Sequence, residues 1–386
     1  MKSKAMKKHI CYLDNAATSF PKPKSVVAEI NKCLTEYCGN AGRGAHRLSL
    51  AAATKTYECR EEISSFINSR IPENVIFVPS CTYGLNLIIK GALDVGDHAL
   101  ISDMEHNSVL RPIHRLSREG KITYDVFDCL LKTDDEILNS IKSKITPRTK
   151  LLVCNHQSNI CSFYAPIEKI GKLCKENNIP LVVDAAQSIG HLDIDMQKMN
   201  ISYLCAPAHK GMYGIQGAGF VVVNSKNKLK TLIEGGNGIR SLDTNMPDFL
   251  PERHESGTLP LPAIVSLREG IKEVNKRTLQ SISDNERCLF RKLRDGMLNI
   301  NAVTVYAPNY EGSTLSFNIK NLSAERVCAL LDEENICTRA GFHCSALAHT
   351  TLGTKETGTL RASFGMFNTP NDVDKLLTTV NNICKF

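Results

Sequence analysis

The chain has 386 residues, of which 42% are hydrophobic and 23% are charged, a balance typical of folded globular proteins and not of disordered ones. Its formal charge of +7 comes without a basic stripe interleaved with aromatic residues, so we expect no nucleic-acid partner. No apolar run reaches the roughly 18 residues of a membrane span, which predicts no membrane partner. The basic start of the chain lacks the apolar segment of a secretory signal.

Fifteen cysteines without an export signal indicate a reducing compartment in which most cysteines are buried thiols, so we expect a cytoplasmic protein. The absence of a C-x-x-C pair argues against zinc-ribbon and thioredoxin-type motifs. Cys344 lies among two histidines, His343 and His349, and is a nucleophile, a metal ligand or a small apolar side chain. No fourth ligand follows at a suitable spacing, so we expect no metal site.

Short apolar strands alternate with amphipathic helices between residues 74 and 224. The segment 167–177 has apolar residues at the spacing of one helix face. It leads into residues 180–186, whose apolar run is typical of a strand buried on both faces of a parallel sheet. Such units predict an α/β fold that binds its ligand at the carboxyl ends of the strands. Further strands are expected at residues 74–79, 98–103, 150–155, 202–207 and 219–224, with a helix after the first.

After about residue 255 the regular alternation ends. The run from Thr369 to Asp372 is a capping box with proline at the first helical position, which predicts a last helix. Strands are expected at residues 314–319, 336–341 and 359–365, with a helix at 324–335.

These patterns predict two domains. The larger, at residues 16–255, is an α/β domain with a mainly parallel central sheet. The smaller is an α+β domain made of residues 1–15 and 256–386. The proline-rich stretch 246–262 is the expected crossover between them.

Two residues at strand ends indicate a cofactor. Asp184 closes an apolar strand, where a carboxylate is costly unless it meets a cation or a strong donor. Lys210 lies between a strand and a glycine-rich turn, where burial would lower the pKa of its amine and favour a Schiff base. The ordinary alternatives are a helix N-cap for Asp184 and a surface position for Lys210. Together they fit pyridoxal phosphate (PLP), which needs an amine for its aldehyde and a carboxylate for its ring nitrogen.

PLP also needs a cradle for its phosphate. Pro79–Gly84 ends a strand and opens a helix, so backbone N–H groups and the Thr82 hydroxyl can face an anion. The sequence therefore places a candidate phosphate site before the predicted carboxylate and amine.

In their shared order these motifs resemble the cysteine desulfurase family, which has the class V aminotransferase fold (PLP-dependent transferase fold type I). The segment RAGFHC is similar to the R-x-G-x-H-C loop of the type II and selenocysteine-lyase-like members. The resemblance covers nearly the whole chain. It is also carried by YLDNAAT, EHNSVLRP, HQSNI, DAAQ, HK, ESGT and LRASFGMFNT.

The resemblance implies a role for each matching residue. Lys210 holds the cofactor and then acts as general base, Cys344 carries the persulfide on a mobile loop, and His106 stacks on the ring and shuttles a proton. The residues implied to bind the cofactor are Lys210, Asp184, Gln187, His106, Cys81, Thr82, Asn159, His209 and Thr258, the last reaching the phosphate of a neighbouring subunit. The candidates for substrate binding are Arg361, as anchor of the substrate carboxylate, with Asn159, Arg339 and His46.

Two of these assignments have an alternative or a restriction, and one depends on positive charge near the thiol. We expect Cys81 to act through its backbone, and His46 is equally suited to a structural role. His343, Arg339 and His106 are the expected sources of positive potential that would lower the pKa of the Cys344 thiol.

The phosphate loop departs from the family pattern. The usual S-G-A/T-T-E is Pro79, Ser80, Cys81, Thr82 and Tyr83 here. No hydroxyl precedes the lysine at Pro207 and Ala208, and Ile215 replaces the proline of the family's Y/L-G-P. We therefore expect weaker cofactor retention, by about 1 kcal/mol for each lost neutral hydrogen bond.

The resemblance predicts a homodimeric, PLP-dependent cysteine desulfurase. It would convert L-cysteine to L-alanine and pass a persulfide from Cys344 to an acceptor protein. One alternative is a selenocysteine lyase or another C–S lyase of the same fold, and a second is a PLP-fold protein with a binding or regulatory role. The sequence leaves open the acceptor, the pathway, the choice between cysteine and selenocysteine, and the role of His349.

Overall fold

The computed structural model describes residues 10–42 and 44–385. The basic start of the chain, residues 1–9, lies outside the described residues, as does the corresponding part of the predicted small domain. Contacts divide the chain into two units. We call Pro21–Ser158 with Tyr164–Gln280 the large unit, and the described part of Met1–Phe20, with Asn159–Phe163 and the chain from Ser281 onward, the small unit.

The large unit is built on a seven-stranded sheet in the order β2-β8-β7-β6-β5-β3-β4. All its strands run parallel except β8, which is antiparallel to both of its neighbours. The predicted fold, with a mainly parallel central sheet, is thus confirmed. The strands are β2 Val75–Val78, β3 His98–Ser102, β4 Thr123–Phe127, β5 Thr149–Asn155, β6 Leu181–Asp184, β7 Tyr203–Pro207 and β8 Gly219–Val223.

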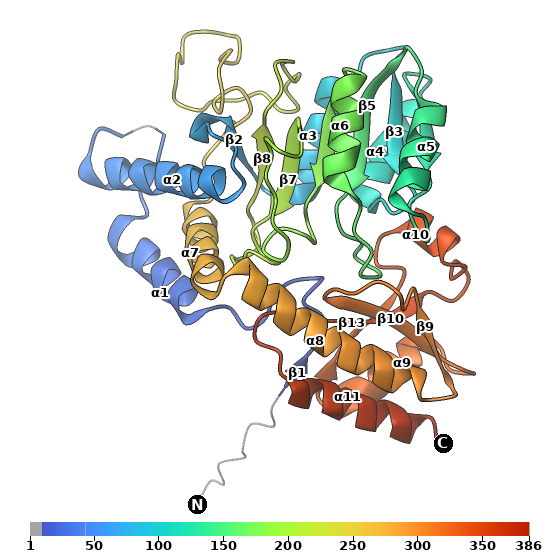
Figure 1. Ribbon diagram of the computed structural model, residues 1–386. Coiled ribbons are helices and arrows are strands. Elements are labelled where there is room, and N and C mark those ends of the chain that lie inside the picture. Colours follow the sequence, from blue (N-terminus) through green and yellow to red (C-terminus); the bar gives the residue numbers. More distant parts are fainter. Residues whose placement is uncertain (1–9, 43, 386) are drawn as a thin grey trace, which may run out of the picture. The chain divides into compact units, whose positions relative to one another are not determined.

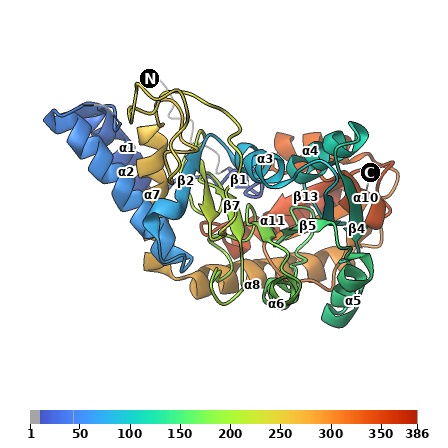
Figure 2. The ribbon, with the colours of Figure 1, turned by 90° about the horizontal axis from the view of Figure 1, so that it is seen from above.

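Helices cover both faces of this sheet, α3 and α4 on one face and α5 and α6 on the other (Figure 2). In α6 the predicted apolar face, Ile167, Ile170, Leu173 and Cys174, is buried. Burial on both faces explains why β6 is wholly apolar up to its last residue. The helices are α3 Cys81–Ala92, α4 Asn107–Arg118, α5 Asp134–Lys144 and α6 Ile167–Glu176.

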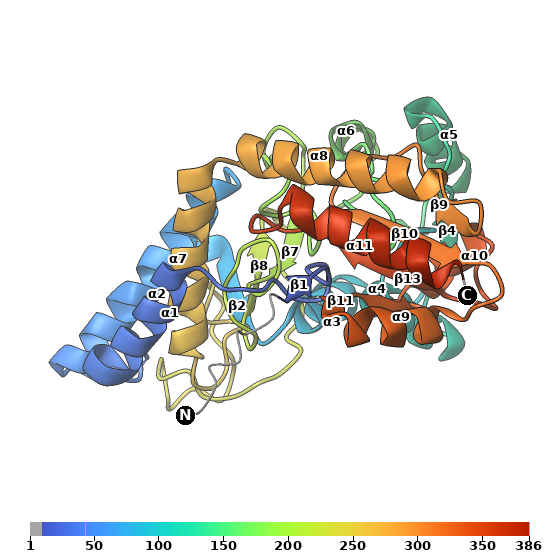
Figure 3. The ribbon, with the colours of Figure 1, turned by 90° about the horizontal axis from the view of Figure 1, so that it is seen from below.

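Three further helices of the large unit, α1, α2 and α7, pack side by side (Figures 1 and 3). Cys33, Tyr37, Ala52, Leu261 and Val265 form a small apolar cluster among them. Neither the short turn of π-helix that follows α1 nor these helices were predicted from the pattern. Their bounds are α1 Lys24–Lys32, the π-helix Cys33–Tyr37, α2 Arg47–Phe66, a 3-10 turn at Pro72–Asn74 and α7 Leu261–Arg277.

The small unit contains a four-stranded antiparallel sheet, β12-β13-β10-β9, and a two-stranded parallel pair, β1 with β11. Side chains of α8, α9 and α11 form one apolar core with β10 and β13. The strands are β1 Cys11–Tyr12, β9 Val303–Tyr306, β10 Thr314–Ile319, β11 Ile336–Cys337, β12 Arg339–Gly341 and β13 Thr359–Ser363. The helices are α8 Leu279–Leu298, which begins in the last residues of the large unit, α9 Ala324–Glu333, α10 Ala346–Thr351 and α11 Pro370–Ile383.

Two local predictions for this region differ in outcome. The capping box at Thr369 and Asp372 is present at the start of α11. The stretch 246–262, expected to be a crossover, lies wholly within the large unit, and the division falls at Gln280–Ser281 instead. The proposed domain boundaries at residues 15/16 and 255/256 stay a prediction. No helix of the described chain has the length and apolar character that crossing a membrane requires.

Candidate active site

The first group of predicted site residues lies at one edge of the large unit's sheet. Strands β2, β3, β5, β6 and β7 are parallel to one another, so their carboxyl ends share that edge. Asp184 is the last residue of β6, and Lys210 follows β7 by three residues. Cys81 and Thr82 open the helix after β2, and His106 precedes the helix after β3. The fold therefore brings the predicted carboxylate, amine, imidazole and anion cradle to the same edge.

Asp184 is a buried carboxylate, only 2% exposed, with one oxygen engaged. Its Oδ1 accepts a hydrogen bond from the backbone N–H of Ala186 at 2.9 Å and from the Cys81 thiol at 3.6 Å. Within the described chain, no group donates to the other oxygen, Oδ2. A carboxylate oxygen that can still accept a hydrogen bond suits a ligand that brings a proton.

The turn that carries Lys210 is held by contacts to its backbone. Lys22 donates from Nζ to the carbonyl of His209 at 3.0 Å, and burial lowers the pKa of Lys22 to about 8. Gly190 and Gly211 let the segment after β6 approach this turn closely, since a Cβ on Gly190 would lie 2.2 Å from the Gly211 carbonyl oxygen. This contact places the segment of Gln187 against the turn that carries Lys210.

His106 is the N-cap of α4 and is linked to Thr82. Its Nδ1 accepts from the backbone N–H of Ser108 at 3.1 Å, so the proton of the neutral ring lies on Nε2. The Ser108 hydroxyl lies 2.8 Å from His106 Nδ1 and 2.8 Å from the Thr82 hydroxyl oxygen. One serine therefore orients both the imidazole and the hydroxyl of the phosphate cradle.

These residues fit pyridoxal phosphate. The unengaged Oδ2 of Asp184 suits a protonated ring nitrogen, and Lys210 supplies an amine for the aldehyde. The start of α3 suits a phosphate because a helix N-terminus carries partial positive charge. The test rests on the Asp184 carboxylate, whose hydrogen bonds within the described chain go to Oδ1 and leave Oδ2 for a ligand.

The altered phosphate shell is visible in the structure. The Ser80 hydroxyl accepts from the backbone N–H of Tyr83 and thus caps the helix itself. Pro207, the last residue of β7, pairs with Gly219 and offers no hydroxyl. Ile215 donates its backbone N–H to Ser266. Of the predicted cradle, the Thr82 hydroxyl and the first N–H groups of α3 remain.

Three other predicted residues also belong to the large unit. His46 is exposed and caps α2, with Nδ1 accepting from Ser49 at 3.4 Å. His209 has its pKa lowered to about 4, first by burial and then by the charges of Lys210 and Lys22. Thr258 is exposed. The predicted binding roles of these residues stay predictions.

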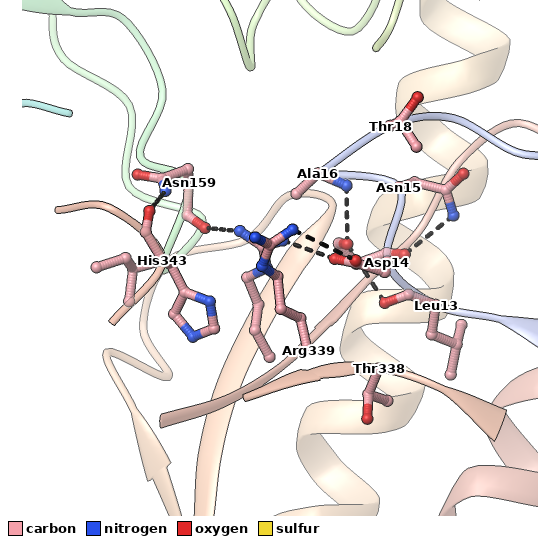
Figure 4. A network of polar contacts seen from close by, with 12 residues as sticks. Leu13, Asp14, Asn15, Ala16, Thr18, Asn159, Thr338, Arg339 and His343 are labelled. Atoms are coloured by element: carbon pink, nitrogen blue, oxygen red, sulfur yellow. Dashed lines mark hydrogen bonds and ion pairs between the residues drawn. The ribbon is translucent and has the colours of Figure 1, made fainter. Parts of the chain in front are cut away.

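The second group of residues lies in the small unit and centres on two arginines that share one carboxylate. Arg361, in the middle of β13, is 2% exposed and donates to Asp14 Oδ1 at 2.7 Å. Arg339, on the neighbouring strand, lies 3.8 Å from Asp14 Oδ2. Figure 4 shows Asp14 and Arg339 facing each other. A parallel bridge between Asp14 and Ser363 ties the carboxylate to β13. Two cations against one anion leave a net positive charge, which suits one substrate carboxylate.

Cys344 lies on the turn between β12 and α10, and its side chain is exposed. Both His343 and Cys344 have left-handed backbone angles, with φ of 48° and 58°. The side-chain amide of Asn159 contacts both neighbours of Cys344, since it donates to the His343 carbonyl at 2.6 Å and accepts from the Ser345 hydroxyl at 2.7 Å. Figure 4 shows the contact with His343. The predicted mobility of this loop stays a prediction.

His343 and His349 form the inner side of this turn. Their rings stack at 5.9 Å, and His349 makes a 2.7 Å hydrogen bond with the Thr354 hydroxyl. His343 Nε2 lies 3.0 Å from the carbonyl oxygen of Thr359. His349, whose role the sequence left open, is a buried packing residue of the turn.

The expectation that His343 supplies positive charge to Cys344 is wrong at neutral pH. Burial, followed by the charge of Arg361, lowers the pKa of His343 to about 3. The ring is therefore neutral near pH 7. Arg339 and Arg361 are the fixed positive charges of this unit's site.

A pH-dependent effect on stability follows from the buried His343. The unfolded chain takes up a proton at this residue near pH 6.5, whereas the folded protein resists it until about pH 3. Its contribution is therefore complete above pH 6.5 and is lost as the pH falls, by up to about 1.4 kcal/mol per pH unit. Urea unfolding at pH 7.5 and 5.0 should show wild type losing stability relative to His343→Gln. An equal loss of stability in the two proteins between pH 7.5 and 5.0 would show that His343 is not held neutral by burial.

Three residues of these groups were not predicted from the sequence. Asp14 was part of a matched segment and Ser345 directly follows one, but neither had an assigned role, and Ser108 follows Asn107 in EHNSVLRP. Asp14 and Ser345 contact residues that are distant in sequence, Arg361 and Asn159. Ser108 contacts the nearby His106. For Ser108 the available signal was its position two residues after His106, a spacing at which serine forms local hydrogen bonds.

Comparison with known proteins gives consistent results. The family described as Aminotransferase class-V matches residues 11–376. A probable cysteine desulfurase from Pyrococcus abyssi is 31% identical, over 97% of this chain and 94% of that protein. A cysteine desulfurase from Wigglesworthia glossinidia brevipalpis is 30% identical, over 98% and 93%. The apo structure of a cysteine desulfurase from Thermococcus onnurineus NA1 is 29% identical, with a TM-score of 0.88 over 97% of this chain and 95% of that one.

Proposed function

Because this chain belongs to the class-V aminotransferase family, and within it to the cysteine desulfurases, we propose that it converts L-cysteine to L-alanine and takes the sulfur as a persulfide on Cys344. The observation that carries the proposal is an exposed thiol on the turn after β12, the strand that pairs with the strand of buried Arg361. A thiol nucleophile and a carboxylate anchor are what the reaction requires in addition to the cofactor.

Lys210, Asp184 and the start of α3 would hold PLP, with His106 against its ring. When bound, PLP draws electrons from the substrate and so makes cleavage of the C–S bond possible. Thr82 would contribute a hydroxyl to the phosphate, and Gln187 an amide to the ring oxygen.

The chain's own residues would act in the following way. Arg361 binds the substrate carboxylate, and Arg339 adds positive potential. The Lys210 amine takes the proton from the substrate Cα. The Cys344 thiolate attacks the substrate sulfur, so an S–S bond forms as the C–S bond breaks, and the carbon left behind gains a proton. Cysteine and enzyme thiol thus give alanine and enzyme persulfide, with no outside oxidant or reductant.

We further propose a cytoplasmic homodimer that hands the persulfide to an acceptor protein, for example in iron–sulfur cluster assembly. Large apolar side chains are exposed on α1, α2 and the segment 231–258 of the large unit, which supports a protein interface there. Analytical ultracentrifugation tests the dimer. The exposed side chains are Val27, Leu48, Leu50, Tyr57, Ile233, Leu242 and Phe249.

The proposed reaction is tested by loading the purified protein with PLP and supplying L-cysteine with a thiol reductant. We expect alanine and sulfide in equal amounts, since the reductant releases the persulfide sulfur. A protein that binds no PLP, or that binds it and makes no alanine, would contradict the proposal. Selenocysteine in place of cysteine distinguishes the lyase alternative by the ratio of kcat/KM values.

Arg361→Lys should raise the KM for L-cysteine by about 10-fold to 100-fold, because lysine cannot pair with a carboxylate through two parallel N–H groups. Cofactor absorbance should stay as in wild type, since the change is in the small unit. Steady-state kinetics check the result. Arg326→Lys, a surface position on α9 of the same unit, is the matched control. An unchanged KM for Arg361→Lys would refute the anchor.

A further inference from the structure

The turn that carries Cys344 is an unfavourable piece of backbone. His343 and Cys344 are consecutive residues with positive φ, a conformation that disfavours residues with a Cβ. A turn of this kind persists only where surrounding contacts hold it. The Cys344 thiol makes no hydrogen bond to any residue of the described chain, so the contacts must act on its neighbours.

Those contacts come from one buried amide. Asn159, 4% exposed, uses Nδ2 on the His343 carbonyl and Oδ1 on the Ser345 hydroxyl. Ser345 itself is fully buried. The two bonds, of 2.6 and 2.7 Å, flank Cys344 on both sides and leave its side chain exposed. We call Asn159 and Ser345 the turn clamp.

The turn clamp is anchored to the strand that carries Arg361. The backbone carbonyl of Asn159 accepts from Arg361 at 2.9 Å. The segment of Asn159 is bonded to β10, the neighbour of β13, because Ser316 donates to the Ile160 carbonyl and Ser162 exchanges two bonds with Thr314. One residue thus joins the predicted carboxylate anchor to the turn of the thiol.

We propose that Asn159 and Ser345 are positioning residues that fix the Cys344 thiol relative to the guanidinium of Arg361. The inference rests on the proposed function for its chemical meaning. A substrate held by its carboxylate would meet a thiol at a preset distance, so the turn need not be ordered at the moment of reaction. The role differs from the cofactor and substrate contacts expected for Asn159, because its amide is engaged with the turn.

The turn clamp itself is tested without cofactor or substrate, by hydrogen exchange of the peptide 342–349. Ser345→Ala removes one bond of the clamp and leaves a buried amide oxygen unpaired. We expect exchange in this peptide to become about threefold to tenfold faster, the factor that loss of one hydrogen bond gives. Ser345→Thr keeps the hydroxyl and should restore slow exchange. Ser323→Ala deletes the hydroxyl that caps α9 in the same unit, away from the turn clamp and its anchor, and should leave the peptide unchanged.

Single-turnover kinetics test the consequence for the thiol. In the PLP-loaded protein, Ser345→Ala should slow persulfide formation on Cys344 by about tenfold with the KM for L-cysteine unchanged, because a misplaced nucleophile affects the chemical step. Unchanged exchange, or faster exchange with an unchanged persulfide rate, would overturn the proposal. A wild type that forms neither alanine nor persulfide would refute the proposed function instead, and the exchange experiment would still decide the clamp.

Discussion

Lys210→Ala should bind PLP reversibly but should no longer be labelled by borohydride reduction, and its production of alanine from L-cysteine should fall at least about a thousandfold. The amine has two proposed tasks, to hold the cofactor aldehyde and to take a proton from the substrate, and general base catalysis alone contributes about 10²-fold to 10⁴-fold. The Lys210 turn is held by Lys22 and by the close approach of Gly190 and Gly211, so the substitution removes the amine and leaves the backbone in place.

The matched control for this experiment is Lys230→Ala. Lys230 also belongs to the large unit, but it forms an exposed ion pair with Asp94, and surface pairs contribute little to stability. Borohydride labelling and alanine production should stay at the wild-type level. Retained labelling in Lys210→Ala would show that another lysine carries the cofactor, and the half-buried Lys22 would be the first candidate.

Cys344→Ser should lose transfer of sulfur to any acceptor and lower alanine production by at least about a hundredfold, while cofactor binding stays normal. A hydroxyl keeps the size of the side chain on the turn but lacks the nucleophilicity of a thiolate. Cys288→Ser removes another exposed thiol from the small unit and should behave like wild type.

This experiment also separates the desulfurase from the C–S lyase. A lyase would release sulfide or selenide without the thiol, so full activity of Cys344→Ser on cysteine would favour that alternative. Activity on selenocysteine alone would have the same meaning. A binding or regulatory protein of the same fold would show neither activity, and its absorbance would not change on addition of PLP.

Much of the large unit follows from local sequence. Strand β6 is apolar as far as Asp184 because both faces of a parallel sheet are covered. The register of β6 with its neighbours places Asp184 beside Asn155 and Cys205. Once the strands are known to be parallel, the carboxyl-end rule brings Asp184 and the Lys210 turn together. The predicted sheet and its edge were therefore accessible from residue patterns.

The small unit's site was less accessible because its contacts join distant segments. The Asp14 carboxylate pairs with Arg361 across 347 positions of sequence, and Asn159 meets Ser345 across 186. A hydrogen bond between such segments leaves no periodic pattern in the sequence. The charge of His343 was mispredicted for the same reason, because its burial and its proximity to Arg361 are tertiary properties.

The central claim, that Cys344 receives the substrate sulfur, is tested most directly by mass spectrometry. The PLP-loaded protein is given L-cysteine for a short time without reductant, alkylated and digested. The account predicts one additional sulfur atom on the peptide that contains Cys344, removable by dithiothreitol, together with alanine in equal amount. Alanine without that adduct, or the adduct on a different cysteine, would contradict it.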